Sequence, residues 1–136
     1  MKFTREQAEG LYTVHAYQSG SVTLNSPDPA DARDEEGRIV LTESFIVSPR
    51  HLMREWRPDR LEQIEGRDLG VIAEFRPEIL LLGTGESLLF PNNSLTAAII
   101  ELGVGYEIMS SPAACRTYNL LAAEGRRVAA AIIIEN

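Results

Sequence analysis

Small polar residues that can bind an anion follow two predicted strands in the second half of the chain. Gly83-Thr84-Gly85 follows the apolar run Glu78 to Leu82, and Ser111 follows the next predicted strand. A glycine-rich turn after a strand can cradle phosphate, but the dinucleotide fingerprint requires a third glycine where this chain has Leu88, and no P-loop motif follows. The turn is therefore either a phosphate-binding loop or a tight turn whose glycines supply positive φ.

The helices expected after these strands direct their N-terminal N–H groups toward one edge of the sheet. Helix N-termini attract anions, and open α/β sheets bind ligands at the carboxyl ends of their parallel strands. The candidate ligand-binding residues are Gly83, Thr84, Gly85, Asn93, Ser111, Cys115 and Arg116. Two interpretations stay open: a small anion site, weakened because Pro112 lacks an N–H, and a set of polar residues that only cap helices.

Cys115, the only cysteine, stands in the first turn of a predicted helix. The helix dipole lowers a thiol pKa there and can produce a nucleophile; the alternative is an inert, buried side chain. Catalysis also needs a base, and the two histidines, His15 and His51, are far apart in the sequence. The chain has no Gly-x-Ser-x-Gly motif and no clustered metal ligands. We therefore assign no catalytic residue, and we expect no metal and no cofactor.

A second candidate surface combines arginines with the only tryptophan. Such residues are enriched at protein interfaces and can also stack on nucleic-acid bases. The residues are Arg50, Arg54, Trp56, Arg57 and Arg60. Glu55 and Asp59 are interleaved with them, so the segment is either a contact surface or a solvated face. The acidic residues between Asp28 and Glu36 are a possible electrostatic partner for these arginines, either within the molecule or in a second copy.

Strand and turn signals alternate before position 77. The sequence predicts strands over residues 11–17, 21–24 and 38–47. Residues 25–37 are rich in proline and acidic residues and predict an exposed, mobile acidic loop. Weaker helical patterns cover residues 50–56 and 68–75.

From Pro77 onward the pattern changes to alternating strands and helices, which predicts a βαβ core over residues 77–136. Strands are expected over 78–82, 87–90, 106–109 and 127–134. One helix is capped by Asn92 or Asn93 and ends at Gly103; the other has Ser111 as its N-cap and ends at Gly125. Two consecutive strand-helix-strand units imply parallel strands with right-handed crossovers. The unalternating last strand predicts burial on both faces.

The composition bounds the class of protein. The 136 residues fit one domain, residues 1–136, with residues 1–10 as an N-terminal segment. The net charge of -7 opposes binding to nucleic acid. The longest apolar run, Val128 to Ile134, is too short for a membrane helix, so no direct membrane insertion is expected. Without a recognisable signal peptide and with one cysteine, the chain is expected to be cytoplasmic.

The chain also resembles a known family. The resemblance rests on residues 44–49, on Leu82-Gly83-Thr84-Gly85, and on the segment from Thr117-Tyr118-Asn119 to Glu124-Gly125-Arg126, and it covers residues 10–134. The family is one of uncharacterised small proteins, including a mitochondrial respiratory complex I assembly factor and an adipogenesis-associated protein. It brings no established reaction or catalytic residue. The lack of a mitochondrial presequence fits a bacterial cytosolic member.

The resemblance implies a three-layer α/β fold with a mixed, partly parallel central sheet and a β-hammerhead in the β-rich N-terminal part. The expected function is a non-enzymatic protein-interaction module, with an unknown protein partner and a possible homo-oligomeric state, and the resemblance implies that it is assembly-factor-like. The alternative function is a small anionic-ligand binder or enzyme that uses the strand-end edge near Thr84, Ser111 and Cys115.

Overall fold

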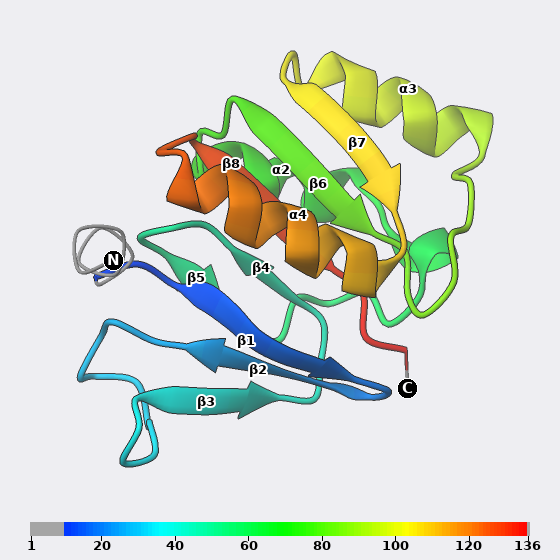
Figure 1. The fold of residues 1–136 in the computed structure, drawn as a ribbon. Helices are drawn as coiled ribbons and strands as arrows, with labels where there is room; N and C mark the ends of the chain where they lie inside the picture. Colours follow the sequence, from blue (N-terminus) through cyan, green and yellow to red (C-terminus); the bar gives the residue numbers. More distant parts are fainter. Residues whose placement is uncertain (1–9, 136) are drawn as a thin grey trace.

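The computed structural model describes residues 10–135, so of the predicted N-terminal segment only Gly10 is described. These residues form two β-sheets (Figure 1). The smaller sheet is antiparallel and has the order β1-β2-β3, with β1 at Thr13–Gln18, β2 at Ser21–Asn25 and β3 at Arg38–Leu41. Gly20, with a φ of 84°, makes the tight turn between β1 and β2.

The larger sheet has five strands in the order β5-β4-β8-β6-β7. Its strands are β4 (Phe45–Val47), β5 (Leu52–Met53), β6 (Ile79–Gly83), β7 (Gly105–Met109) and β8 (Val128–Ile132). β6 pairs in parallel with both β7 and β8, whereas β4 pairs antiparallel with β8 and β5. The predicted α/β class with a mixed, partly parallel sheet is confirmed.

Three α-helices and one 3-10 helix are described within residues 10–135: η1 (Leu61–Gln63), α2 (Gly66–Glu74), α3 (Asn93–Glu101) and α4 (Ser111–Ala123). The Asn92 side chain caps α3 by accepting the Leu95 N–H at 2.8 Å. At α4 the cap is Ser110 and not the predicted Ser111. The hydroxyl of Ser110 accepts the Ala113 N–H, which leaves the Ser111 hydroxyl for other partners.

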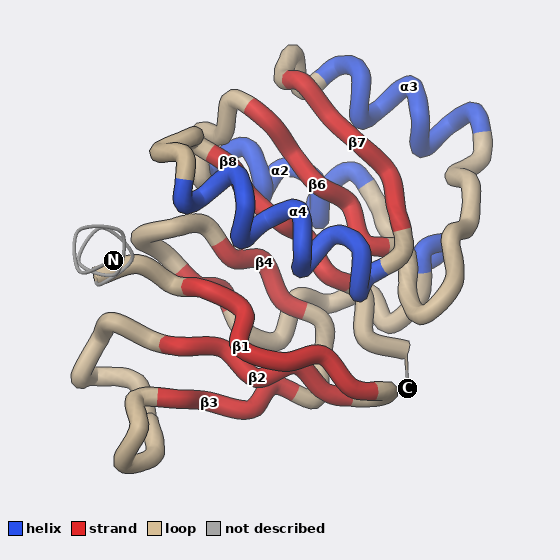
Figure 2. The backbone as a smooth tube through the Cα atoms, in the orientation of Figure 1, coloured by secondary structure: helices blue, strands red, loops and turns tan. Residues whose placement is uncertain are grey.

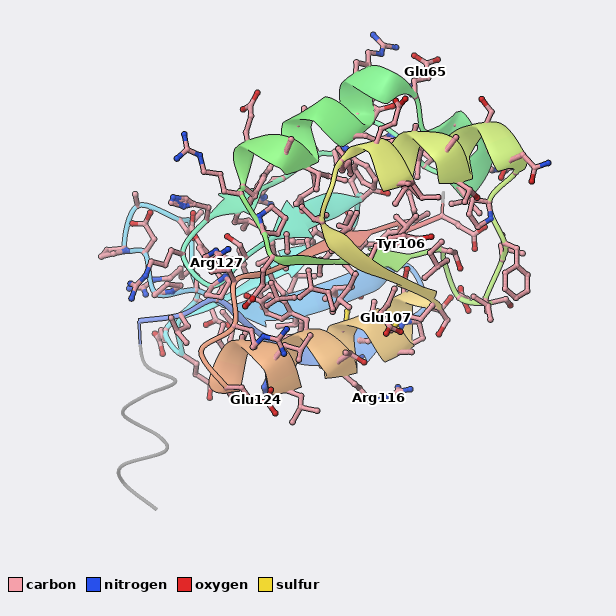
Figure 3. The ribbon with its side chains drawn as sticks, turned by 90° about the horizontal axis from the view of Figure 1, so that it is seen from above. Glu65, Tyr106, Glu107, Arg116, Glu124 and Arg127 are labelled. Carbon is pink, nitrogen blue, oxygen red and sulfur yellow. The ribbon has the colours of Figure 1, made fainter. Side chains whose placement is uncertain are left out.

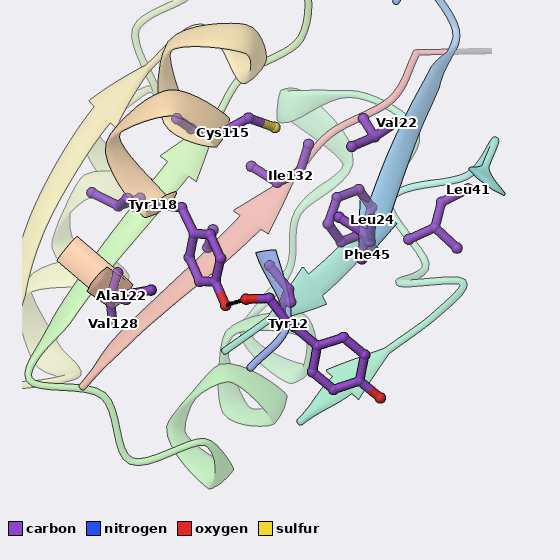
Figure 4. Packing of buried hydrophobic residues seen from close by; sticks show 14 of the residues in the cluster. Tyr12, Val22, Leu24, Leu41, Phe45, Cys115, Tyr118, Ala122, Val128 and Ile132 are labelled. Atoms are coloured by element: carbon purple, nitrogen blue, oxygen red, sulfur yellow. Dashed lines mark hydrogen bonds between the residues drawn. The ribbon is translucent and has the colours of Figure 1, made fainter. Parts of the chain in front are cut away.

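The large sheet lies between two layers. In Figure 3, α2 and α3 cover one face and α4 covers the other. The small sheet packs beside α4, and its contact with the helix is made by Tyr118, whose hydroxyl donates to the Tyr12 carbonyl at 2.7 Å (Figure 4). Asn119 adds two hydrogen bonds to the backbone of Val14, each 2.8 Å long. These bonds fix β1 to α4.

The central strands are buried on both faces because successive side chains of a strand point to opposite sides. Leu81 packs in the apolar cluster beneath α4, while Leu80 and Leu82 pack in the cluster beneath α2 and α3. β8 follows the same rule, with Ala130 on the α4 side and Ala131 on the other. The predicted burial of the last strand on both faces is confirmed.

Three predicted elements are wrong. Residues 38–47 form two strands in different sheets, because the chain turns at residues 42–44 and the buried Ser44 hydroxyl accepts the Ile134 N–H at 3.0 Å. Residues 50–56 form β5 and a turn instead of a helix, with Glu55 at a φ of 59°. Residues 87–90 form no strand and belong to the long loop between β6 and α3 (Figure 2).

The acidic loop, residues 25–37, is exposed over most of its length. Several of its carboxylates nevertheless have partners within the fold, among them Asp31 and Asp34. Asp31 accepts hydrogen bonds from the Tyr12 hydroxyl at 2.8 Å and from the Ser26 hydroxyl. Asp34 accepts the backbone N–H groups of Glu36 and Arg38, and the bond to Arg38 is the main cause of its lowered pKa. These bonds define the path of the loop.

Candidate functional site

The predicted anion-binding edge at the end of β6 is filled by the protein itself. Thr84 and Ser111 are fully buried. The Ser111 hydroxyl accepts the Gly85 N–H at 2.9 Å and donates to the Ile133 carbonyl at 2.7 Å. The Thr84 N–H is bonded to the Met109 carbonyl. The polar groups that an anion would need at this edge already have partners inside the fold.

Glycine is required where β6 meets α4. A Cβ atom at Gly83 would lie 2.8 Å from the Ser111 Oγ atom and 2.9 Å from the Ser111 Cα atom. At Gly85, which has a φ of 116°, a Cβ atom would lie 2.7 Å from the Glu135 carboxylate. These glycines therefore serve a tight turn and a close packing contact, which is the second of the two interpretations of the Gly83-Thr84-Gly85 motif.

The remaining predicted ligand-binding residues do not gather around a common space. Asn93 is exposed at the start of α3, and Arg116 points away from the sheet on the outer face of α4 (Figure 3). Cys115 is buried, and this burial raises the pKa of its thiol to about 12, against the lowering expected from the helix dipole. The thiol is therefore protonated at neutral pH, as in an inert core cysteine.

The arginine and tryptophan segment does not form one surface. The prediction that Trp56 is an exposed contact residue is wrong, because its side chain is only 2% exposed and its indole N–H donates to the Asp68 carbonyl at 3.3 Å. Arg57 pairs with the Asp68 carboxylate at 2.7 Å. Although burial by itself raises the pKa of Asp68, the hydrogen bonds from Arg57 and from the Glu65 N–H hold it below its usual value.

The other three arginines of the segment are exposed and lie apart. Arg54 lines a small hollow with Thr42 and Glu43, beside the end of β3. Arg60 precedes η1 and is exposed. Arg50 lines a larger hollow at the opposite end of α2 from η1. Among residues 10–135, no three histidine, cysteine or carboxylate side chains come close enough to hold a metal ion.

The strongest surface feature is a run of apolar side chains in the loop between β6 and α3. Leu88, Leu89 and Phe90, which we call the apolar loop, are 47%, 41% and 81% exposed. The Thr84 hydroxyl shapes this loop, because it donates to the Ser87 carbonyl at 2.7 Å and accepts the Leu89 N–H at 3.0 Å. The buried turn at the end of β6 thus presents three large apolar side chains to solvent.

The apolar loop forms one wall of a groove of about 590 Å³, which we call the apolar groove. η1 and the start of α2 form the opposite wall, and the first turns of α3 complete it. The lining residues are Leu61, Glu62, Ile64, Glu65, Gly66, Leu89, Phe90, Pro91, Asn92, Ser94, Leu95 and Ala98. Among the described residues, the charged side chains in the lining are those of Glu62 and Glu65, so a mainly apolar groove carries negative charge, which we call its acidic rim.

Comparison with known proteins identifies relatives of unknown or partly described role. The family described as "Protein of unknown function (DUF498/DUF598)" matches residues 14–133. A protein of Francisella tularensis named "13 kDa major membrane protein" is 40% identical over 75 residues, which cover 55% of this chain and 61% of that protein.

The human protein "NADH dehydrogenase (ubiquinone) 1 alpha subcomplex assembly factor 3" is 28% identical over 131 residues, which cover 95% of this chain and 64% of that protein. The chain thus spans less than two thirds of the length of either of these two relatives. A Bordetella pertussis protein described as a Mth938-like domain has a similar structure, with a TM-score of 0.71, 26% identity, and coverage of 93% of this chain and 88% of that one. These matches confirm the predicted family.

One relative has a membrane protein's name, and this bears on the expected location. Within residues 10–135, no helix has the length and apolar composition that a membrane crossing requires. Because the Francisella relative is named a membrane protein, the cytoplasmic location of this chain stays a prediction.

Proposed function

The chain belongs to the DUF498/DUF598 family, and we propose that it is a non-enzymatic protein-interaction module that works in the manner of an assembly factor. Its partner is a different protein, which inserts an apolar segment into the apolar groove. The carrying observation is the exposure of Leu88, Leu89 and Phe90 beside this groove.

Burial of the apolar loop supplies binding free energy. A contiguous exposed apolar patch marks an interaction site in a soluble protein, whereas scattered apolar residues do not. Covering a phenylalanine or leucine side chain contributes about 1.5–3 kcal/mol. Phe90, the most exposed of the three, is therefore the expected anchor, and Leu61, Ile64 and Leu95 line the groove that receives the partner's side chains.

The acidic rim restricts the chemistry of the partner. Glu62 has no ion-pair partner among residues 10–135, and Glu65 pairs with Arg67 at 3.0 Å in an exposed contact that is worth little. Within residues 10–135, no basic side chain lines the groove. A partner segment with apolar residues at its centre and lysine or arginine at its edges fits this surface, because complementary charge favours encounter and fixes orientation.

The relatives support a binding role over a chemical one. The human relative carries the name of an assembly factor, which supports a role in contacts with other proteins. The alternative function, a small-anion binder or enzyme, would use the edge near Thr84, Ser111 and Cys115. At that edge the hydroxyls are bonded within the fold and the thiol is buried, so the interaction module is the better-supported function.

Replacement of Phe90 tests the proposal. Tagged wild-type protein, Phe90→Ser and Leu120→Ser are each isolated from cells of the source organism, and the co-purified proteins are quantified by mass spectrometry. Leu120 is the matched control because its side chain is 61% exposed and lies on α4, away from the groove. Both variants remove an exposed side chain, so their unfolding free energies should stay within about 0.5 kcal/mol of the wild type.

The expected result is a partner that is retained by the wild type and Leu120→Ser and lost by Phe90→Ser. That partner must also carry a segment that combines apolar and basic residues. Equal recovery of all co-purified proteins with the two variants would contradict the proposal, as would a partner that proves to be a second copy of the chain.

A further inference from the structure

A second hollow lies at the opposite end of α2. It has a volume of about 680 Å³ and is bounded by the turn between β4 and β5, the end of α2 and the end of α4. We call it the arginine cavity, because four of its lining residues are Arg50, Arg76, Arg126 and Arg127. This concentration of positive charge is unexpected in a chain with a net charge of -7.

Most of these guanidinium groups are available for a ligand. Arg126 is bonded to the Glu78 carboxylate at 3.0 Å. Within residues 10–135, Arg50, Arg76 and Arg127 have no carboxylate at ion-pair distance. Arginines near the C-terminus of a helix can interact favourably with the helix dipole. Arg50 belongs to neither α2 nor α4, so this interaction does not explain why all four arginines lie together.

The backbone of Arg76 makes this residue the best position for a test of the cavity. Arg76 follows the C-cap of α2 and has a φ of 50°, in the left-handed region that glycine adopts without steric cost. A side chain at this position therefore costs free energy that glycine would save. Replacement of Arg76 by glycine therefore removes a guanidinium group from the cavity without straining the backbone.

We propose that the arginine cavity binds an acidic peptide segment of a protein partner. The cavity floor is apolar, with Leu11, Phe75 and Val128 among its residues, and suits the apolar side chains of a peptide. Glu74 and Glu124 also line it and repel a dense polyanion such as nucleic acid. A peptide that carries one or two carboxylates among apolar side chains satisfies both conditions, because arginine forms strong charge-assisted hydrogen bonds with carboxylates.

This site is distinct from the apolar groove and does not depend on it. α2 has nine residues and is therefore about 14 Å long. Figure 3 shows Glu65 at one end of the helical layer and Arg127 and Glu124 at the other end of the sheet. The two ends carry opposite charge, so one chain is able to hold a basic apolar segment and an acidic segment at the same time.

Peptide selection on the full chain, residues 1–136, tests this inference. A display library of short random peptides is selected on the wild type, and the enriched peptides are then measured on the wild type and on Arg76→Gly. The glycine variant relieves the left-handed backbone, so it should fold with a melting temperature at or above that of the wild type. Arg54→Ser is the control, because Arg54 is exposed and lies outside the cavity.

Enriched peptides should contain aspartate or glutamate between apolar residues. Measured by fluorescence anisotropy, their affinity should fall about tenfold or more on Arg76→Gly, and equally when the peptide carboxylates are replaced by amides. Arg54→Ser should bind like the wild type. The inference is overturned if the enriched peptides lack acidic residues, if Arg76→Gly binds them normally, or if inorganic phosphate or a single-stranded oligonucleotide displaces them at equal concentration.

Discussion

Ser111 connects the end of β6 with the end of β8. The sequence predicts that Ser111 is a helix N-cap and a candidate anion-binding residue. In the structure Ser110 caps α4, and the Ser111 hydroxyl accepts the Gly85 N–H and donates to the Ile133 carbonyl. Replacement by alanine leaves both of these buried groups without a partner. Ser111→Ala should therefore lower the free energy of unfolding by about 1–3 kcal/mol.

Urea denaturation, followed through the fluorescence of the single tryptophan, Trp56, measures this change. Ser94→Ala, at an exposed position in α3, should change the unfolding free energy by less than about 0.5 kcal/mol. Equal stability of the two variants would show that the Ser111 hydroxyl does not hold the strand ends together.

Two buried acids should make the stability fall in alkali. Burial raises the pKa of Cys115 from 9.0 to about 12, and burial with the hydrogen bond to Asp31 raises the pKa of Tyr12 from 10.0 to about 12. The unfolded chain releases these protons first. Both groups thus stabilise the fold fully below about pH 9, and this stabilisation is lost as the pH rises toward 12.

The midpoint of urea unfolding, measured at several values between about pH 8 and pH 11, tests this expectation. It should decline above about pH 9, and the decline between pH 9 and 10 should be shallower in Cys115→Ala, which has no ionisable thiol. A wild-type midpoint that stays constant, or the same slope in both proteins, would refute the assignment of Cys115 as a protonated core residue.

At the scale of elements, two glycines have opposite structural roles. Gly83 ends β6 against α4, and a methyl group there meets the backbone of Ser111. Gly70 lies within α2, and a methyl group there meets nothing within 4 Å. Gly83→Ala should lower the unfolding free energy by about 1–3 kcal/mol, whereas Gly70→Ala should raise it by about 0.5–1 kcal/mol.

Differential scanning calorimetry of the two variants provides the comparison. The melting temperature should fall in Gly83→Ala and rise in Gly70→Ala, although both variants replace glycine by alanine. A stabilised or unchanged Gly83→Ala would mean that β6 and α4 are not in close contact at this position.

The elements were predictable where local signals and burial agree. Asn92 and the glycines after α3 and α4 have positions typical of helix ends, and the apolar run of β8 indicates a central strand. The errors arise where contacts that the residue pattern does not encode decide the structure. Leu52 and Met53 pair with β4 in a short hairpin, the Thr84 hydroxyl bonds the backbone of Ser87 and Leu89, and the turn at Ser44 depends on the distant Ile134.

The candidate sites were less predictable than the fold. Trp56 and Arg57 are adjacent in the sequence, yet one is in the core and the other is bound to Asp68, which lies eleven positions away. The arginine cavity collects its four arginines from three separate segments. A signal for the apolar loop was present in the sequence, since three large apolar residues between Ser87 and Pro91 have no polar alternation.

For the whole molecule, the net charge of -7 conceals two surfaces of different character. An acidic, apolar surface lies where η1, α2 and α3 begin, and an arginine-rich hollow lies where α2 and α4 end. Such separation suits a protein that holds segments of other proteins in a fixed arrangement. It also explains why average composition is a poor guide to the partners of this chain.

Photo-crosslinking in living cells tests most directly whether the apolar groove holds a partner protein. Benzoylphenylalanine is placed at position 90 and, as a control, at position 120, and the crosslinked peptides are sequenced by mass spectrometry. We expect position 90 to capture one protein through a segment that combines apolar and basic residues, and position 120 not to capture it. Equal capture by both positions, or capture only of this same chain, would contradict the proposed function.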